Sequence, residues 1–407
     1  MKWAIMPALA LSSLTATAGG TDMLNLSGFA TAGVVRTYEA DVRYTRVGID
    51  RPGRERPDSG PDSIIGLQGS LRISDANSAV VQIISRENTD GNYQPRATLA
   101  FLSHQFTPEL TGRVGRLRIP FFMQSDSLNI NYAHPWVRPP EEVYGLNPFS
   151  DLDGVDFLYR TRAGETDIEL HPFAGTSRIP LYPDTNARLK RVAGVNLTLT
   201  RGDFSVRFGH AEADLSIHWR DPLFKALAPV LLSPGLDRRD IVAQMAGDSG
   251  KVRFSSAGFQ WDNGDWLLVG EYARRQSQRY ANSAHAWQFT AGYHFGPVTP
   301  YLVFARHAQK SPVVSDDQIA SLPPFPELDP LRGGLAVFNA SRNLAQRSIT
   351  AGVRWDVLDN TALKAEFARS RTADDAWGTF DPANDRAASR MGNRSINTLS
   401  LSVDVTF

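Results

Sequence analysis

The side chains with the clearest capacity for chemistry are charged groups on the polar side of segments in which apolar and polar residues alternate. Arginine far outnumbers lysine among them. It keeps its charge at any working pH and presents a planar fork that binds carboxylate, sulfate or phosphate. The basic positions are Arg72, Arg96, Arg116, Arg118, Arg160, Lys190, Arg207, Arg354 and Lys364. The acidic positions are Asp156, Glu169, Asp356, Glu366 and Asp404.

Enzymatic motifs are weak in this sequence. Residues 247–250 read Gly-Asp-Ser-Gly, which resembles the nucleophile turn of chymotrypsin-like proteases, but Lys251 follows where that family has a further glycine. No histidine lies in a recognisable partner motif, and no Walker loop, G-x-S-x-G elbow or H-E-x-x-H motif is present. We therefore expect no enzyme and no catalytic residues. A hydrolase whose serine, histidine and acid converge from distant segments stays open as a minor alternative.

Metal and cofactor sites are not expected either. The eight histidines are scattered along the chain, and there is no cysteine. The missing cysteines exclude thiolate metal sites, cysteine nucleophiles and disulfide scaffolds.

Composition excludes several classes of protein. The 407 residues are 42% hydrophobic and 21% charged, with a formal net charge of zero. This hydrophobic content and zero net charge exclude a disordered chain. Without an excess of positive charge to bind phosphates, nucleic acid is not an expected partner. Beyond the first residues there is no uncharged apolar run of 18 or more, which excludes a helical membrane protein. A transmembrane β-barrel is compatible with all of these observations. Its lipid-facing residues alternate with polar ones, so its strands contain no long apolar run.

The first 18 residues read as a secretory signal. Lys2 gives the positive start, an apolar stretch covers 4–14, and Ala16-Thr17-Ala18 fits a cleavage site. We expect two parts, a signal peptide at 1–18 and one transmembrane barrel at 19–407.

Period-two alternation is clearest at the end of the chain. Leu399, Leu401, Val403, Val405 and Phe407 alternate with small or polar residues. Such a strand has one face for hydrocarbon or core and one for water. Sixteen such segments are predicted, at 24–35, 65–73, 79–86, 96–106, 110–119, 155–162, 167–174, 193–199, 204–208, 252–261, 266–273, 287–295, 298–307, 349–357, 363–369 and 395–407.

The connections between these segments also alternate. Seven are short and rich in Gly, Asn, Asp or Pro, as tight hairpins require, at 75–77, 107–109, 163–165, 201–203, 262–265, 296–297 and 359–360. Eight are longer and polar, the largest at 121–153, 216–250 and 309–346. This asymmetry is typical of an outer-membrane barrel, and an even strand number puts both ends of the barrel on the short-turn side.

Aromatic residues gather near both ends of the predicted strands, as expected at two membrane interfaces. Those beside short turns are Phe204, Trp261, Trp266, Phe295 and Phe407, and those near long links are Trp219, Tyr272 and Trp287. Within 221–246, residues 223–227 and 241–245 are each predicted to form a short helix.

The leader, the sixteen segments and terminal Phe407 together resemble the sixteen-stranded porins of Gram-negative outer membranes. This resemblance implies an all-β, antiparallel barrel in the outer membrane, with lipid and lipopolysaccharide around it and a homotrimeric assembly. It also implies that Phe407 is presented to the barrel-assembly machinery. In that family the loop after the fifth strand folds into the lumen, and residues 121–153 occupy this position.

The resemblance gives the charged residues a role at the constriction. The loop at 121–153 carries Asp126, Arg138, Glu141 and Glu142, and the strand before it carries Arg116 and Arg118. Two rows of opposite charge across a narrow water path create a transverse field, and ring charge and diameter set selectivity.

We therefore expect a passive channel for small hydrophilic solutes that favours anionic or zwitterionic ones. In the alternative interpretation the arginines pair with acidic neighbours and only keep the wall hydrated. A ligand-specific channel or an adhesin with recognition in its long loops also stays open.

Overall fold

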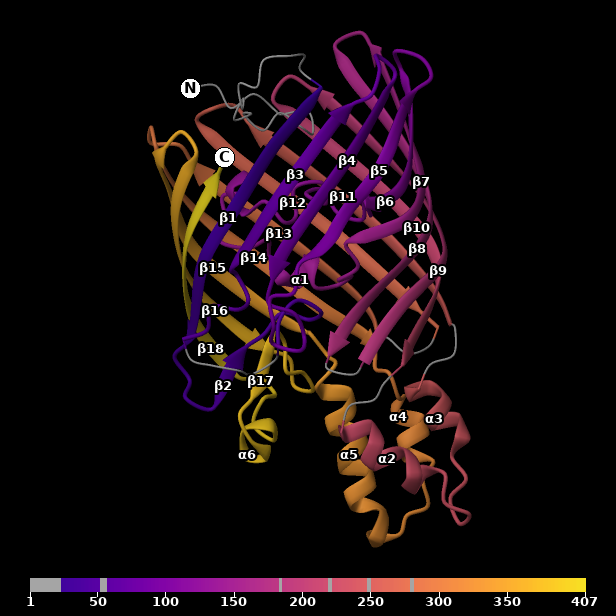
Figure 1. Cartoon of the computed structure of the whole chain (residues 1–407). Coiled ribbons are helices and arrows are strands. Elements are labelled where there is room, and N and C mark those ends of the chain that lie inside the picture. The colour runs from indigo at the N-terminus through magenta and orange to yellow at the C-terminus, as the bar shows by residue number, and fades with distance from the viewer. Residues whose placement is uncertain (1–22, 52–56, 183–184, 219–221, 247–249, 279–281) are drawn as a thin grey trace.

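The described residues form a closed antiparallel barrel of sixteen strands (Figure 1). The computed structural model describes residues 23–51, 57–182, 185–218, 222–246, 250–278 and 282–407. The barrel strands are β1 (Leu24–Thr37), β3 (Ile64–Arg72), β4 (Asn77–Arg86), β5 (Arg96–Gln105), β6 (Leu110–Arg118), β7 (Asp151–Ala163), β8 (Thr166–Tyr182), β9 (Thr185–Arg201), β10 (Phe204–His218), β11 (Gly250–Asp262), β12 (Trp266–Ser277), β13 (Ser283–Tyr293), β14 (Val298–Ser311), β15 (Gln346–Leu358), β16 (Thr361–Thr372) and β18 (Ser395–Thr406).

The remaining elements lie in the long connections. Strands β2 (Val42–Tyr44) and β17 (Phe380–Pro382) pair in a small sheet of their own. The helical elements are η1 (Asn131–Ala133), α1 (Glu141–Tyr144), α2 (Pro222–Leu231), α3 (Arg239–Met245), α4 (Asp316–Ala320), η2 (Pro326–Leu328), α5 (Asp329–Ala340) and α6 (Asp385–Ala388). Among the described residues no helix is long and apolar enough to cross a membrane.

The predicted strand number and the seven short turns are confirmed. Every strand pairs with its neighbours in the chain order, and β1 closes the barrel against β18. The start of β1 and the C-terminus lie at the short-turn end of the barrel, the upper end in Figure 1. The predicted signal peptide at 1–18, Trp219 and residues 247–249 of the Gly-Asp-Ser-Gly motif lie outside the described residues.

The outer face of the barrel is apolar because alternate residues of each strand point away from the lumen. Leu67 on β3, Leu102 on β5 and Leu401 on β18 are 57%, 56% and 45% exposed. Aromatic rings flank this band at both ends, including Phe295 at the short-turn end and Trp287 toward the long loops. An exposed apolar surface of this extent is stable only against lipid.

The polarity of the wall reverses along β8–β11 toward the long-loop end. There Ile179, Leu189, Ile217 and other apolar side chains point inward and are buried, while charged side chains point outward. The outward residues are Arg178, Arg188, Lys190, Arg191, Glu212, Lys251 and Arg253. Lys190 is therefore not a lumen residue, contrary to the sequence prediction.

Strand length explains this reversal. Strands β8 and β9 have 17 residues each, and a strand of that length tilted by roughly 40° rises about 40 Å. The apolar band of such barrels is only about 25 Å tall. The part of the wall near the long loops thus stands in water on its outside. The same length also shortens a connection that the sequence predicts as long, because the β8–β9 hairpin joins Tyr182 to Thr185.

Two helices predicted in 221–246 are confirmed as α2 and α3. They pack with α5 and with residues of the 312–345 connection, and Figure 1 shows α2–α5 as a group beyond the long-loop end of the barrel. Leu231, Ile241, Met245, Leu335 and Phe338 are fully buried in this group.

Candidate functional site

The connection between β6 and β7 folds into the barrel, and α1 lies inside the ring of strands in Figure 1. We call residues 119–150 the inner loop; the predicted loop, 121–153, started slightly late and included the first residues of β7. Pro120, Pro135, Pro139, Pro140 and Pro148 restrict its backbone and lower the entropy cost of fixing it. Its path is set by hydrogen bonds to inward side chains of the wall.

The first anchor is a buried lysine. Lys364 on β16 donates from Nζ to the carbonyl oxygens of Asn131 at 2.6 Å and Trp136 at 2.9 Å. The same ammonium pairs with Asp404 on β18 at 2.8 Å, and both side chains are 0% exposed. Asp404 in turn accepts from the Thr31 hydroxyl on β1 at 2.7 Å. One cation thus holds two turns of the inner loop against three adjacent strands.

The neighbouring wall residues hold the same stretch of loop. Arg354 on β15 donates to the carbonyl oxygens of Tyr132 and His134, at 2.5 and 2.8 Å, while pairing with Asp356. Glu366 on β16 accepts from the backbone N–H of Val137 at 3.1 Å. Buried donors and acceptors that are satisfied in this way fix one conformation.

A second anchor joins the inner loop to residues 38–63, the connection between β1 and β3. Arg138 forms a two-pronged pair with Asp62, with its Nε 2.6 Å from Oδ1, and donates to the Ser400 hydroxyl at 2.9 Å. Arg46 pairs with Glu141 at 2.6 Å in the same buried cluster. Burial alone would raise the pKa of Asp62, but Arg138 and Arg46 outweigh burial and the pKa is lowered.

The first half of the inner loop packs against β8–β12. The rings of Phe121 and Phe122 contact the Phe254 ring of β11 in a tilted and an edge-to-face arrangement, with centroids 4.9 and 5.2 Å away. The side chain of Gln124 donates to Gln260 at 2.8 Å. These contacts leave Asp126 about half exposed toward the water inside the barrel.

Asp126 faces a group of arginines on the wall. It lies 3.9 Å from Arg207 on β10 and is close enough to Arg113 and Arg118 on β6 to interact with both electrostatically. Arg118 is buried and donates to Gln82 and to the Ser150 carbonyl, both at 3.3 Å. The structure thus places Asp126 of the inner loop beside Arg118 and Arg207 of the wall, with charges of opposite sign.

Arg116 is the clear error in the predicted set. It lies on the same face of β6 as Val114, which is 53% exposed on the lipid side, and pairs with Asp153 at 2.7 Å. Placing Arg116 on the water-filled side would, by alternation, turn the apolar residues Leu117 and Ile119 toward the lipid. Both are buried inside the barrel, at 0% and 1% exposure. Ile119 packs with apolar residues of the inner loop, whereas Leu117 packs with Val80 and Phe101 of the wall.

Arg113 takes the place expected for Arg116. It pairs with Asp156 through Nε at 2.8 Å and lies over the Phe101 ring at 5.3 Å. The signal was present in the sequence, since Leu110 and Val114 are one face of β6 and Arg113 is on the other. Arg46 and Asp62 were missed as well, and no pattern in the 38–63 connection marks them.

The other predicted charges have structural partners. Glu141 and Glu142 are buried against the wall, where Glu142 accepts from Gln346 at 2.8 Å, so neither lines the water path. Arg96 pairs with Asp151 at 2.6 Å and stays 42% exposed to the lumen. At the short-turn end Arg160 pairs with Glu169 and Arg72 with Asp75. For these residues the alternative interpretation, arginines paired with neighbouring acids, describes the arrangement.

Space remains on both sides of the inner loop. Toward the short turns, a cavity of about 490 Å³ is lined mainly by polar residues of β1 and β3–β6, such as Asn25, Gln68, Ser103 and Thr111. Toward the long loops, a cavity of about 100 Å³ is lined mostly by apolar groups. Within the residues that the structure describes, no cluster of histidine or carboxylate side chains could hold a metal ion.

We expect the anchored connection 38–63 to lose stability as pH rises. Burial raises the pKa of Asp50, whose Oδ1 accepts from the Arg46 N–H at 2.7 Å, to about 8. The folded chain therefore keeps a proton that the unfolded chain releases near pH 4, and stability falls between about pH 4 and 8. Asp50→Asn should remove this part of the pH dependence. Thermal midpoints from heat-modified gel migration at pH 5 and pH 8.5 test it, and equal pH slopes for both proteins would contradict it.

No protein-family model and no curated protein matches this sequence. Solved structures do match over nearly the whole chain. OmpT of Vibrio cholerae, an outer membrane protein, in a trimer form has 10% identity over 94% of this chain and 99% of that chain, with a TM-score of 0.54. An anion-selective porin from Comamonas acidovorans has 12% identity over 94% and 99%, with a TM-score of 0.53.

The outer membrane channel DcaP of Acinetobacter baumannii is similar to the same degree, with 13% identity over 94% and 97% and a TM-score of 0.53. At these identities the likeness concerns the fold. The chain has the closed sixteen-stranded barrel fold of bacterial outer-membrane porins and channels.

Proposed function

We propose that this protein is an outer-membrane porin, a passive channel for small hydrophilic solutes with a preference for anionic or zwitterionic ones. The observation that carries the proposal is the inner loop. It is anchored by buried charges to the wall and presents Asp126 opposite Arg113, Arg118 and Arg207. A loop held this way narrows the water path, and the opposed charges act on a solute as it passes.

The anionic preference follows from the balance of charge along β5, β6 and β10. Arg96 and Arg113 each have one carboxylate partner. Arg118 forms no ion pair among the described residues. Arg207 lies 3.9 Å from Asp126, a carboxylate that also interacts with Arg113 and Arg118. An excess of guanidinium groups at the narrowest part raises the local concentration of anions. One of the similar barrels, the Comamonas acidovorans porin, is itself anion-selective, which agrees with this interpretation.

The proposal contains no enzymatic step, because solutes move down their own gradient. It places the barrel in outer-membrane lipid and lipopolysaccharide, and it takes a homotrimer as the assembly, in keeping with the trimer form of one similar barrel. Phe407 would be read by the barrel-assembly machinery. In the folded barrel its backbone N–H and carbonyl pair with Gly28 at 2.9 and 2.6 Å, which closes the last strand on the first.

Removing the arginines that face Asp126 should shift ion selectivity toward cations. At about 5 Å in water, one unit charge contributes about 0.8 kcal/mol, or roughly fourfold in relative occupancy. Reversal potentials of single channels in a KCl gradient should therefore show the anion-to-cation permeability ratio falling several-fold in Arg113→Gln/Arg118→Gln. Asp126→Asn should move the ratio the other way.

The matched control is Arg116→Gln. This arginine is on the same strand and carries the same charge, but it faces outward, so selectivity should not change. A wild-type channel with clear cation preference would refute the anionic part of the proposal, and an equal shift in Arg116→Gln would refute the assignment of residues. Absence of any conductance in a correctly folded barrel would refute the channel itself.

A further inference from the structure

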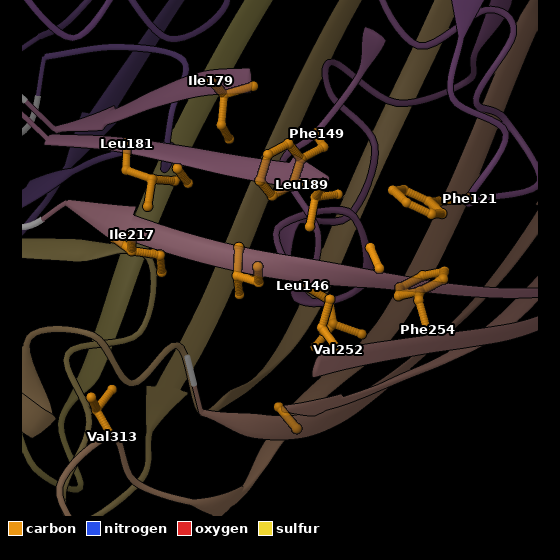
Figure 2. Packing of buried hydrophobic residues seen from close by; sticks show 14 of the residues in the cluster. Phe121, Leu146, Phe149, Ile179, Leu181, Leu189, Ile217, Val252, Phe254 and Val313 are labelled. Carbon is orange, nitrogen blue, oxygen red and sulfur yellow. The ribbon is translucent and has the colours of Figure 1, made fainter. Parts of the chain in front are cut away.

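The cavity on the long-loop side of the inner loop is apolar where a diffusion pore needs a wet wall. It has a volume of about 100 Å³ and lies between the inner loop and the parts of β8–β11 nearest the long loops. Figure 2 shows Phe121, Phe149, Leu189, Val252 and Phe254 around this region, with side chains turned toward one another from the loop and the strands.

A cavity of this size is not a packing defect. Protein interiors are packed as densely as organic crystals, and voids larger than a water molecule are few. Water gains little beside aliphatic and aromatic walls, since it needs two to four polar partners. By contrast, the pockets that bind small organic molecules have mostly apolar linings with a few polar groups that fix the ligand's orientation. The lining of the cavity matches that description.

The polar side chains at the edge of the cavity are hydrogen-bond donors. Arg275 on β12, Asn282, Asn147 and Arg342 line it. The guanidinium of Arg275 donates to neutral acceptors only, which are the carbonyl oxygen of Leu146 and the backbone and side-chain oxygens of Asn282. Of its five N–H donors, these bonds use three. No carboxylate of the described residues forms an ion pair with Arg275, although the residue is partly buried between the wall and the loop.

One carboxylate, that of Glu212, borders the cavity but does not neutralise the charge of Arg275. Glu212 pairs with Arg253 at 2.8 Å, and the two side chains are 55% and 59% exposed on the outer wall. A partly buried cation without a counter-charge is costly, and an anion that reaches it stabilises it.

We propose that this cavity is a binding site for an amphiphilic organic anion, an aromatic or alkyl carboxylate. The apolar body lies against the wall formed by Leu189, Leu215, Val252 and Phe254, and the carboxylate accepts hydrogen bonds from Arg275. This inference rests on the proposed function and refines it, because the site holds such a solute just before the constriction at Asp126. It makes the channel selective for a class of solutes.

Block of the open channel by phenylacetate tests the site. Single channels in KCl are titrated from the long-loop side with phenylacetate, with acetate, which lacks the ring, and with 2-phenylethylamine, which carries the opposite charge. Phenylacetate should block the current at concentrations at least about tenfold lower than either comparator. Equal potency of acetate and phenylacetate would overturn the apolar part, and equal potency of the amine would overturn the cationic part.

Variants locate the site. Arg275→Met should weaken the phenylacetate block about tenfold or more, the scale of one charge-assisted hydrogen bond. Leu189→Gln should weaken it while leaving acetate unaffected. Arg274→Met is the matched control, since Arg274 is exposed on the opposite face of β12, and its channel should be blocked like the wild type. If Arg275→Met does not fold, as judged by heat-modified migration, the wild-type series still decides the question.

The two proposals fail differently. A folded barrel without KCl conductance contradicts the channel, whatever phenylacetate does. A conducting channel that phenylacetate leaves unblocked contradicts only the binding site.

Discussion

Lys364→Met is expected to release the inner loop from the wall and to destabilise the barrel by about 3–5 kcal/mol, the usual cost of leaving one partner of a buried ion pair alone. The variant leaves Asp404, whose side chain is 0% exposed, without its ion-pair partner. It also removes the donor to the carbonyl oxygens of Asn131 and Trp136. The thermal midpoint from heat-modified migration should fall, and single-channel conductance should rise and become noisy as the loop moves.

A double variant separates the two effects. Lys364→Met/Asp404→Leu replaces the pair by apolar groups and should recover most of the lost stability. The loop carbonyls stay without donors, so the conductance should stay high. Lys190→Met, on the outer wall, is the control and should change neither property. A single variant with wild-type midpoint and conductance would show that Lys364 does not anchor the loop.

Asp62→Asn is expected to have an effect of similar size at the other end of the inner loop. Arg138 would then be buried without its carboxylate, at a cost of about 3–5 kcal/mol. The pKa of Asp62 is lowered in the folded state, because Arg138 and Arg46 outweigh its burial. Its contribution to stability is therefore complete above the unfolded value of about 3.9 and is lost as pH falls through the folded pKa.

The measurement is the thermal midpoint as a function of pH. Wild type should lose stability in acid more steeply than Asp62→Asn, which has already lost the pair at neutral pH. Asp375→Asn, an exposed residue of the connection between β16 and β18, is the control and should follow the wild-type curve. Parallel curves for Asp62→Asn and wild type would refute the anchor.

The barrel could be predicted from sequence because its determinants are local. Alternation along one strand, as in the final residues up to Phe407, and turn residues such as those at 263–265 act over a few positions. Sixteen repetitions of such signals give the strand number. The limits of β8–β10 were missed where the outer wall leaves the lipid, since the rule that apolar residues face outward reverses there.

The inner loop could be located but its contacts could not be derived. Arg138 meets Asp62, 76 positions away, and Lys364 meets Asn131, 233 positions away. No spacing along the chain encodes such pairs. The wrong face predicted for Arg116 has a similar cause, because Leu117 packs on Val80 and Phe101 of other strands and Ile119 packs on the inner loop.

The strands differ in length, and this difference sets the height of the barrel wall around its long-loop end. Strands β3–β6 have only 9 or 10 residues, against 15 to 17 in β8–β10, so the rim is low on one side and high on the other. On the low side the 38–63 connection supplies the missing height, and it reaches so close to β8 that a Cβ atom added to Gly48 would lie 3.2 Å from the carbonyl oxygen of Pro180. Shortening this connection would widen the entrance directly. Trimming the β8–β9 hairpin would only lower the rim where it already stands in water.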